Sequence, residues 1–281
     1  MVFNLPPLGS LHRSSPSRRP PRSTHPRKRN PGCCVREVIQ RNLYLSLTTP
    51  HSPFPSHRNL YHQTNQPTLT LTLMLTATGF ITFEDTTIVP TLVSSASGVT
   101  LDLGPGAGNQ IHNLASAAAQ ISHIYGVEPN PHYRVDIEAK LALEEHSALR
   151  GKYELITCGI EDSDVLREHG IEEGSVDCIL CIQVLCAVKD PRSVARECWR
   201  LLRPGGKFVF WEHGGSRDGV VRVGQAVLNP AWSTFVGCRL TRNVLADILD
   251  AGEWENPGDV EEPEDRVSCM PRVQGVLVKR S

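Results

Sequence analysis

The residues with the clearest chemical spacing lie in the run VTLDLGPGAGNQ, Val99 to Gln110. An apolar strand pattern leads to an acid, Asp102, and then to glycines at alternate positions, Gly104, Gly106 and Gly108. Glycine has no Cβ atom, so the backbone can turn sharply there and approach a ligand closely. The run therefore predicts a buried strand, a tight turn and a helix start, with a ligand lying on the turn. A tight turn that binds nothing is the alternative interpretation.

A second acid stands at the end of the next predicted strand. We expect a helix over residues 109–120 and a strand over residues 121–127, which Glu128 ends. In sheets that bind nucleotides, an acid at this point can accept hydrogen bonds from both hydroxyls of a ribose. A solvated acid at a strand end is the alternative for Glu128. Asn109 stands where the dinucleotide fingerprint G-x-G-x-x-G has its last glycine, so a nicotinamide cofactor is disfavoured.

The third predicted strand, residues 153–158, leads into a loop that contains Ile160 and Glu161. Both residues are placed to meet an adenine. Ile160 would offer an apolar surface for the ring, and Glu161 would accept a hydrogen bond from the exocyclic amine.

Strand and helix patterns alternate along the rest of the chain, and nothing repeats internally. We expect helices over residues 131–148 and 191–202, strands over residues 174–188 and 202–214, and a closing edge strand in the C-terminal run RVQGVLVKRS. The long apolar run in 174–188 is typical of a strand buried on both faces of a parallel sheet. The alternation predicts an α/β fold, Rossmann-like and doubly wound, with helices on both faces and the ligand at the carboxyl ends of the strands.

The first 66 residues have a different composition from the remainder. They carry ten Lys or Arg and ten Pro with a single acid, Glu37, whereas residues 67–281 carry 19 basic and 29 acidic residues. We expect a disordered basic leader over 1–66, an apolar lead-in over 67–97 and one folded domain over 98–281. An acidic domain argues against nucleic acid as a partner. The leader's prolines would break the amphipathic helix of a mitochondrial targeting peptide, although targeting stays open.

The apolar run Leu69 to Phe80 has 12 residues, whereas a membrane-spanning helix needs about 20. We therefore expect a packed element or a shallow membrane contact rather than a span. The nine cysteines, several of them in apolar runs, indicate free thiols in a reducing compartment. Cys178 and Cys181 would point to opposite faces of their strand, so we expect buried thiols and no metal site.

The motifs together resemble a known family. DLGPGAG, YGVEPN, SVDCILCIQVLCAV and LRPGGKFVFWEHG are similar to class I S-adenosylmethionine-dependent methyltransferases of the type 11 group. VLNPAWSTFVGCRLTR, residues 227–242, resembles the thiol S-methyltransferases of the methyltransferase-like-seven family. Members of that family carry an N-terminal hydrophobic membrane anchor, and the Leu69 to Phe80 run is the only comparable segment here.

The resemblance implies a seven-stranded methyltransferase sheet and S-adenosyl-L-methionine as cofactor. The methionine part would lie over the glycine turn and the sulfonium near Gln183, while Asp102 and Glu128 would belong to the cofactor site. A small lipophilic thiol is the expected acceptor. An O-methyltransferase of a small natural product, or an S-adenosylmethionine-binding module without turnover, is the alternative. We expect a cytoplasmic protein, with an intracellular membrane surface or the mitochondrion as alternatives; the sequence leaves the oligomeric state open.

Three side chains are candidates for the chemistry at the acceptor. Arg239 and Arg242 would favour the anionic form of a thiol, and His213 would act as the base if the acceptor were a hydroxyl. An apolar lid over the acceptor, or alternatively ordinary core, is expected from four nearby residues, Trp211, Trp232, Phe235 and Val236.

Overall fold

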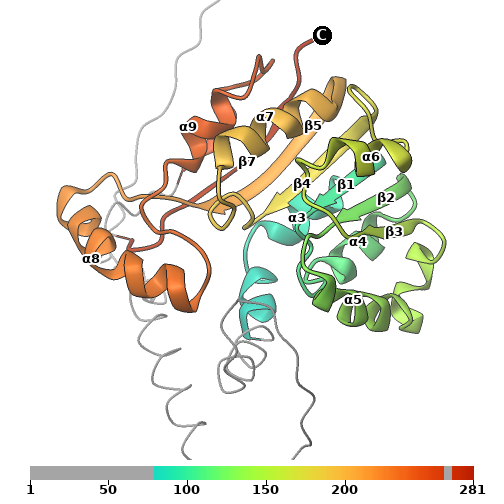
Figure 1. Ribbon diagram of the computed structural model, residues 1–281, viewed down its shortest axis with the longest axis horizontal. Coiled ribbons are helices and arrows are strands. Elements are labelled where there is room, and N and C mark those ends of the chain that lie inside the picture. The colour runs from blue at the N-terminus through green and yellow to red at the C-terminus, as the bar shows by residue number, and fades with distance from the viewer. Residues whose placement is uncertain (1–78, 263–267) are drawn as a thin grey trace, which may run out of the picture.

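The computed structural model describes residues 79–262 and 268–281, without the side chain of Phe235. Its centre is a seven-stranded sheet in the order β3-β2-β1-β4-β5-β7-β6 (Figure 1). The strands are β1 Gly98–Leu103, β2 Ile121–Val127, β3 Tyr153–Ile156, β4 Val176–Ile182, β5 Leu202–His213, β6 Val260–Glu261 and β7 Arg272–Val278. β1 to β5 pair in parallel, whereas β7 is antiparallel to both β5 and β6. This is the mostly parallel, doubly wound sheet that the alternating pattern predicts.

Helices cover both faces of the sheet. They are α3 Val89–Ser94, α4 Ile111–Ala117, α5 Arg134–Leu141, α6 Ser163–Glu168, α7 Pro191–Leu201, α8 Gly219–Phe235 and α9 Val244–Leu249, with 3-10 turns η1 Pro131–Tyr133 and η2 Glu144–Leu149. α3, α4 and α5 share one buried cluster, and α6, α7 and α9 share another. Two residues of β4, three positions apart, confirm that both its faces are buried: Cys178 lies in the first of these clusters and Cys181 in the second.

The prediction of one continuous helix over residues 131–148 is wrong. The chain forms η1, α5 and η2 instead, because Leu143 has extended backbone angles, φ −63° and ψ 143°, which end the helical course. The prediction that RVQGVLVKRS forms the edge strand is also wrong. β7 lies one strand in from the edge, which β6 provides through two residues paired with Gly275 and Gln274.

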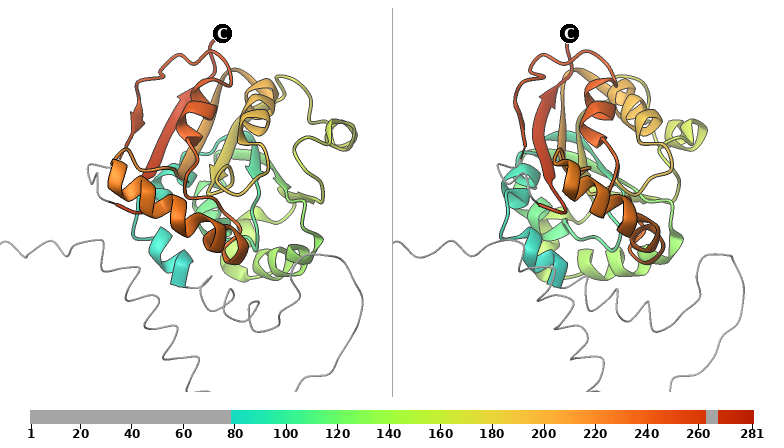
Figure 2. Two further views of the ribbon diagram at one scale, coloured as in Figure 1. Left: turned by 60° about the vertical axis from the view of Figure 1, so that its left-hand side comes forward. Right: turned by 90° about the vertical axis from the view of Figure 1, so that its left-hand side faces the viewer.

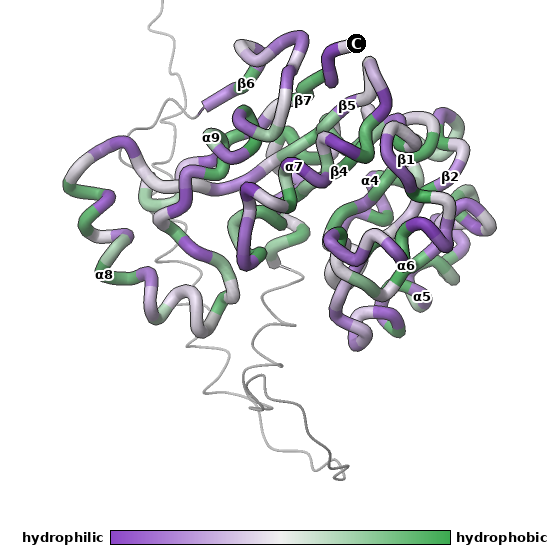
Figure 3. The backbone as a smooth tube through the Cα atoms, turned by 45° about the horizontal axis from the view of Figure 1, so that its top comes forward, coloured by the Kyte–Doolittle hydropathy of each residue, from purple (hydrophilic) through white to green (hydrophobic). Residues whose placement is uncertain are grey.

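α8 lies apart from the other helices, at the opposite end of the molecule from α5 in the view of Figure 1. Asp218 begins it by accepting hydrogen bonds from two backbone N–H groups. Green segments recur along this helix in Figure 3, and several of its apolar side chains are exposed: Val220, Val223, Val227 and Leu228. No helix in 79–262 or 268–281 combines the length and apolar character that crossing a membrane requires.

The chain enters the described domain through helical residues 79–84 and then α3. Figure 2 shows this entry segment at the same end of the molecule as α8. α3 buries Val89, Leu92 and Val93 in the cluster beneath β1 and α4, so it is part of the domain core. The predicted leader, 1–66, and most of the Leu69 to Phe80 run lie outside the described residues.

Candidate cofactor and acceptor site

The glycine turn follows β1 directly, at the carboxyl edge of the sheet. Gly104, Gly106 and Gly108 have φ values of +58°, +55° and +77°, a region that side chains with a Cβ rarely adopt. A Cβ atom on Gly104 would meet Val184 at 3.1 Å, whereas one on Gly106 would have no neighbour within 4 Å. The turn is therefore tight at its start and open at Gly106, where a ligand can approach the backbone.

Glu128 lies beside the open glycine, and its side chain is buried. Its Oε2 accepts the Gly106 N–H at 2.9 Å, and its Oε1 accepts the Asn130 N–H at 2.9 Å. Burial raises the pKa of Glu128 above its usual value. Each carboxylate oxygen keeps a further lone pair, so this acid can still accept hydrogen bonds from a diol.

Asp102 lies at the end of β1, beneath the turn. Its Oδ2 accepts a hydrogen bond from the Tyr153 hydroxyl at 2.9 Å. Burial raises the pKa of Asp102 to about 6, although the Tyr153 hydrogen bond acts in the opposite direction. Gly126 lies between them, since a Cβ there would lie 2.5 Å from the Tyr153 oxygen. The hydrogen bond between Asp102 and Tyr153 joins the end of β1 to the start of β3 next to the glycine turn.

The two candidate adenine residues follow β3, as expected, but their side chains differ in burial. Ile160 is 3% exposed and belongs to a core cluster, so only a small part of it can meet a ligand. Glu161 is exposed and lies against Gly159. Their contacts with an adenine remain a prediction.

Gln183 follows β4 and occupies the centre of a buried polar network. It has φ +61°, the one positive value at a non-glycine position in the described chain. Its Nε2 donates to Glu84 at 3.1 Å, and its Oε1 accepts from Arg272 at 2.8 Å. These two bonds fix the Gln183 side chain. Gln183 is the residue that we predict to lie near the sulfonium.

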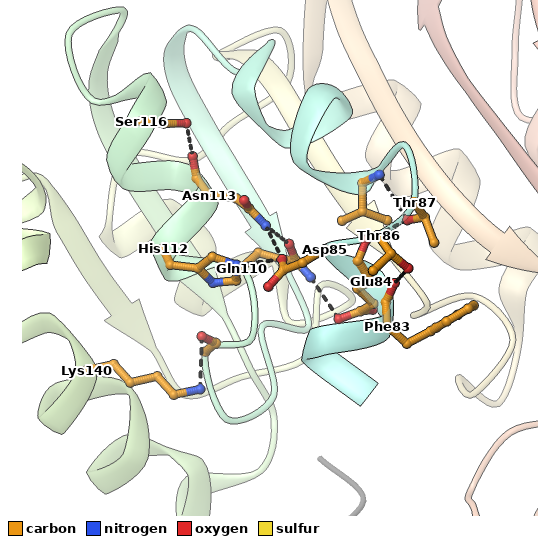
Figure 4. Close-up of polar contacts among 12 residues, drawn as sticks. Phe83, Glu84, Asp85, Thr86, Thr87, Gln110, His112, Asn113, Ser116 and Lys140 are labelled. Atoms are coloured by element: carbon orange, nitrogen blue, oxygen red, sulfur yellow. Dashed lines mark hydrogen bonds and ion pairs between the residues drawn. The ribbon is translucent and has the colours of Figure 1, made fainter. Parts of the chain in front are cut away.

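The sequence analysis missed Glu84, which connects the entry segment to this network. Its Oε2 accepts from Gln110, just before α4, at 3.0 Å (Figure 4). Since Oε1 accepts from Gln183, one carboxylate joins the start of α4 to the end of β4. Burial raises the pKa of Glu84 to about 7. The neighbouring Asp85 adds a contact to His112 at 2.7 Å. No motif surrounds Glu84 in the sequence, so no local signal pointed to it.

Arg272, the first residue of β7, was missed as well. Its guanidinium lies 4.3 Å from the centre of the Trp211 ring and donates to Gln183. It pairs across the sheet with His213 at the end of β5. A cation is therefore fixed beside Gln183, although the sequence shows only one Arg at the start of an apolar strand.

The two arginines selected from sequence have other surroundings. Arg242 donates to the carbonyl oxygens of Leu185 at 2.7 Å and Lys189 at 3.2 Å, which holds the loop after β4. Arg239 is exposed, and its backbone N–H donates to the Cys186 carbonyl. Their predicted roles toward an acceptor remain predictions.

His213 is fully buried, and its Nε2 lies 3.1 Å from the sulfur of Cys238. Trp232 Nε1 donates to the same sulfur at 3.1 Å. The Cys186 thiol donates to the Gln183 carbonyl at 3.6 Å. The interaction of the two thiols, together with the contacts of His213 and Trp232, lowers the pKa of Cys238, while the pKa of Cys186 is raised. The buried Glu212 accepts backbone N–H groups of residues 184–186 and so fixes the loop that carries Cys186.

The four residues expected to form an apolar lid do not share one environment. Trp211 is 2% exposed and belongs to the core, whereas Val236 is 47% exposed. Trp232 is half-buried over Cys238, and the side chain of Phe235 is outside the description. For Trp211 the structure favours the core alternative.

Comparisons with known proteins agree with this geometry. A family model described as "Methyltransferase domain" matches residues 101–210, from β1 to β5. Thiol S-methyltransferase TMT1B of Homo sapiens is 31% identical over 192 residues, which are 66% of this chain and 74% of that protein. The same enzyme of Rattus norvegicus is 31% identical over 161 residues, 54% of this chain and 61% of the relative.

Among solved structures, an O-methyltransferase family protein from Burkholderia thailandensis aligns with a TM-score of 0.53 and 16% identity. The alignment covers 75% of this chain and 60% of that one. At this identity the similarity is one of fold.

Proposed function

Because the chain belongs to the S-adenosylmethionine-dependent methyltransferase family that includes thiol S-methyltransferase TMT1B, we propose that it methylates the sulfur of a small lipophilic thiol. The family's cofactor is S-adenosylmethionine. One observation carries the proposal: an open glycine turn, a buried acid and a fixed guanidinium lie together at the carboxyl edge of the sheet. The acceptor class is inferred from the relatives, which are named for thiols.

The residues around the turn fit such a cofactor. Gly106 leaves room for a ligand to approach the backbone, and Glu128 keeps lone pairs for the ribose hydroxyls. Gly104 and Gly108 would shape the methionine part of the site, with Asp102 bracing it from below. Ile160 and Glu161 would line the adenine end.

The acceptor side would be organised by Gln183 and Arg272. When bound, S-adenosylmethionine would supply an electrophilic methyl group to the acceptor sulfur, so that the products would be S-adenosylhomocysteine and a thioether. The thiol proton would go to solvent. Arg272 would favour the thiolate electrostatically, which places on it the role that the sequence assigned to Arg239 or Arg242. Holding the nucleophile in line can lower the barrier by several kcal/mol.

The described cysteines are all free thiols. This fits action in a reducing compartment, for which the cytoplasm, including the surface of a membrane facing it, is our proposal. Leu228, an exposed apolar residue of α8, lies one helical turn before Trp232, and this part of the helix suits a lipophilic acceptor.

A panel of acceptors tests the proposal. Purified full-length protein receives methyl-labelled S-adenosylmethionine together with alkyl thiols, aromatic thiols and matched phenols and carboxylic acids. We expect label in the thioethers. Label in oxygen products alone would replace the thiol with a hydroxyl or carboxyl acceptor, and S-adenosylhomocysteine binding without transfer to any acceptor would indicate a binding module.

A further inference from the structure

Three potential metal ligands converge beneath the loop after β4. Cys186 lies in that loop, His213 ends β5 and Cys238 follows α8, so the sheet and α8 bring together residues far apart in sequence. One donor atom of each lies within 4.8 Å of the other two. The side chains are 1%, 0% and 9% exposed, respectively. The cluster is therefore dry, and its donors are two sulfurs and one imidazole nitrogen.

The backbone on either side of these ligands is held in place. Glu212 accepts the Cys186 N–H at 3.2 Å, and the Cys186 carbonyl accepts the Arg239 N–H at 2.9 Å. On the other side of the cluster, Asn229 Oδ1 accepts the Leu240 N–H at 2.8 Å, two residues after Cys238. The ligand positions are thus fixed before any ion binds, which favours tight coordination.

Hydrogen bonds already hold these side chains against one another. The Nε2 atom of His213 lies 3.1 Å from the Cys238 sulfur and is the nitrogen placed to bind an ion. The Nδ1 atom, which is buried and has no partner among residues 79–262 and 268–281, would carry the proton of the neutral imidazole. Trp232 Nε1 meanwhile donates to the Cys238 sulfur at 3.1 Å, an outer contact of the kind that supports a metal-bound thiolate.

We propose that Cys186, His213 and Cys238 bind one thiophilic divalent cation of the zinc type. Both sulfurs would bind as thiolates and the imidazole as a neutral third ligand, and binding would release the thiol protons. Two thiolates balance the charge of such an ion, so the buried site gains no net charge. Sulfur and imidazole ligands select zinc over magnesium or calcium, and three protein ligands leave a fourth position open.

The test measures metal binding on the full chain. Cys33 and Cys34, which lie outside the described residues, and the exposed Cys269 are first changed to serine, so that any bound metal can be attributed to the cluster. After removal of metals, zinc is titrated back with a competing chelating dye. We expect one zinc per chain, and a loss of affinity of about a hundredfold or more for Cys186→Ser, Cys238→Ser and His213→Asn. Cys198→Ala, a buried cysteine of α7 outside the cluster, is the matched control and should bind as the parent does.

A spectroscopic measurement keeps the test independent of folding defects in the variants. The parent protein is loaded with cobalt or cadmium, and the thiolate-to-metal absorption and X-ray absorption are recorded. We expect two sulfur ligands and one imidazole nitrogen. The proposal is overturned if folded protein binds no stoichiometric metal, if binding is unchanged by the two serine variants, or if the bound ion has only oxygen and nitrogen ligands. S-adenosylhomocysteine binding, measured in parallel, shows whether the cofactor site is intact whatever the metal result.

Discussion

At the scale of single residues, Glu128 couples the end of β2 to the glycine turn through the Gly106 N–H. We expect Glu128→Ala to weaken S-adenosylhomocysteine binding by about 10- to 100-fold, because hydrogen bonds to a charged group contribute about 1.5–3 kcal/mol. Isothermal titration calorimetry measures this. Glu138→Ala, an exposed acid of α5, is the control for loss of a charge. Equal affinities of the two variants would remove Glu128 from the cofactor site.

Replacing Arg272 should change the pH profile of methyl transfer in a specific way. If it favours the acceptor thiolate, Arg272→Gln raises the pKa of the bound thiol. The acid limb of the kcat profile then moves to higher pH by about one unit, with about a tenfold loss at neutral pH. The loss should be larger for alkyl thiols than for more acidic aromatic thiols.

The same series distinguishes the arginines. Arg239→Gln and Arg242→Gln test the assignment made from sequence, and Arg280→Gln, at an exposed residue after β7, is the control. If the acid limb shifts further for Arg239→Gln than for Arg272→Gln, Arg239 and not Arg272 favours the acceptor thiolate. Equal losses across all thiols would mean that Arg272 acts on structure and not on the thiolate.

At the scale of elements, the sequence predicted the parts whose information is local. The strand, turn and helix around Gly104, and the acid at the end of β2, follow from residue type and spacing over a few residues. Leu143 escaped this reasoning because helical periodicity persists on both sides of its extended backbone. β6 escaped because two residues are too few to show alternation, and β7 was therefore mistaken for the edge.

The site residues that sequence reasoning missed share a physical cause. Each of them contacts residues far away in the sequence, which the strand order brings to one edge of the sheet. This holds for Glu84, Arg272 and the Cys186 cluster. Arg272 reaches Gln183 because β7 inserts next to β5, an arrangement that local spacing does not specify. The sequence thus located the cofactor side more completely than the acceptor side.

Glu84 makes the stability of the folded protein depend on pH. Burial raises its pKa in the folded protein from 4.5 to about 7, so the folded state holds more protons than the unfolded state between these values. The stability that protonated Glu84 provides is complete below about pH 4.5 and is lost as the pH rises through 7, by up to about 3 kcal/mol. Glu84→Gln removes this loss.

We therefore expect the unfolding free energy of Glu84→Gln, relative to the parent, to rise between pH 5 and pH 8. Denaturant unfolding without ligand measures it, with Glu138→Gln as the control for a surface charge. A difference between Glu84→Gln and the parent that stays constant over this pH range would contradict the raised pKa.

At the scale of the whole molecule, the described domain contains the proposed cofactor site, whereas the excess of basic over acidic residues lies in 1–66. That segment combines ten Lys or Arg and ten Pro with one acid, and from this composition we predict too little buried apolar surface to offset its ordering entropy. We expect deletion of residues 1–66 to leave S-adenosylhomocysteine affinity and the methyl-transfer rate within about twofold of the parent.

A longer deletion, residues 1–88, supplies the contrast. It also removes Glu84, and with it the acceptor for the Gln110 and Gln183 amides, as well as Phe83, whose ring lies 6.3 Å from that of Trp211. Leaving buried donors unpaired costs about 1–3 kcal/mol each, so affinity should fall at least about tenfold. Calorimetry and the labelled-methyl assay are applied to both proteins, with circular dichroism to verify folding. If the shorter deletion already loses activity, residues 1–66 contribute to the site, and if the longer deletion retains full affinity, the Glu84 network does not support the cofactor.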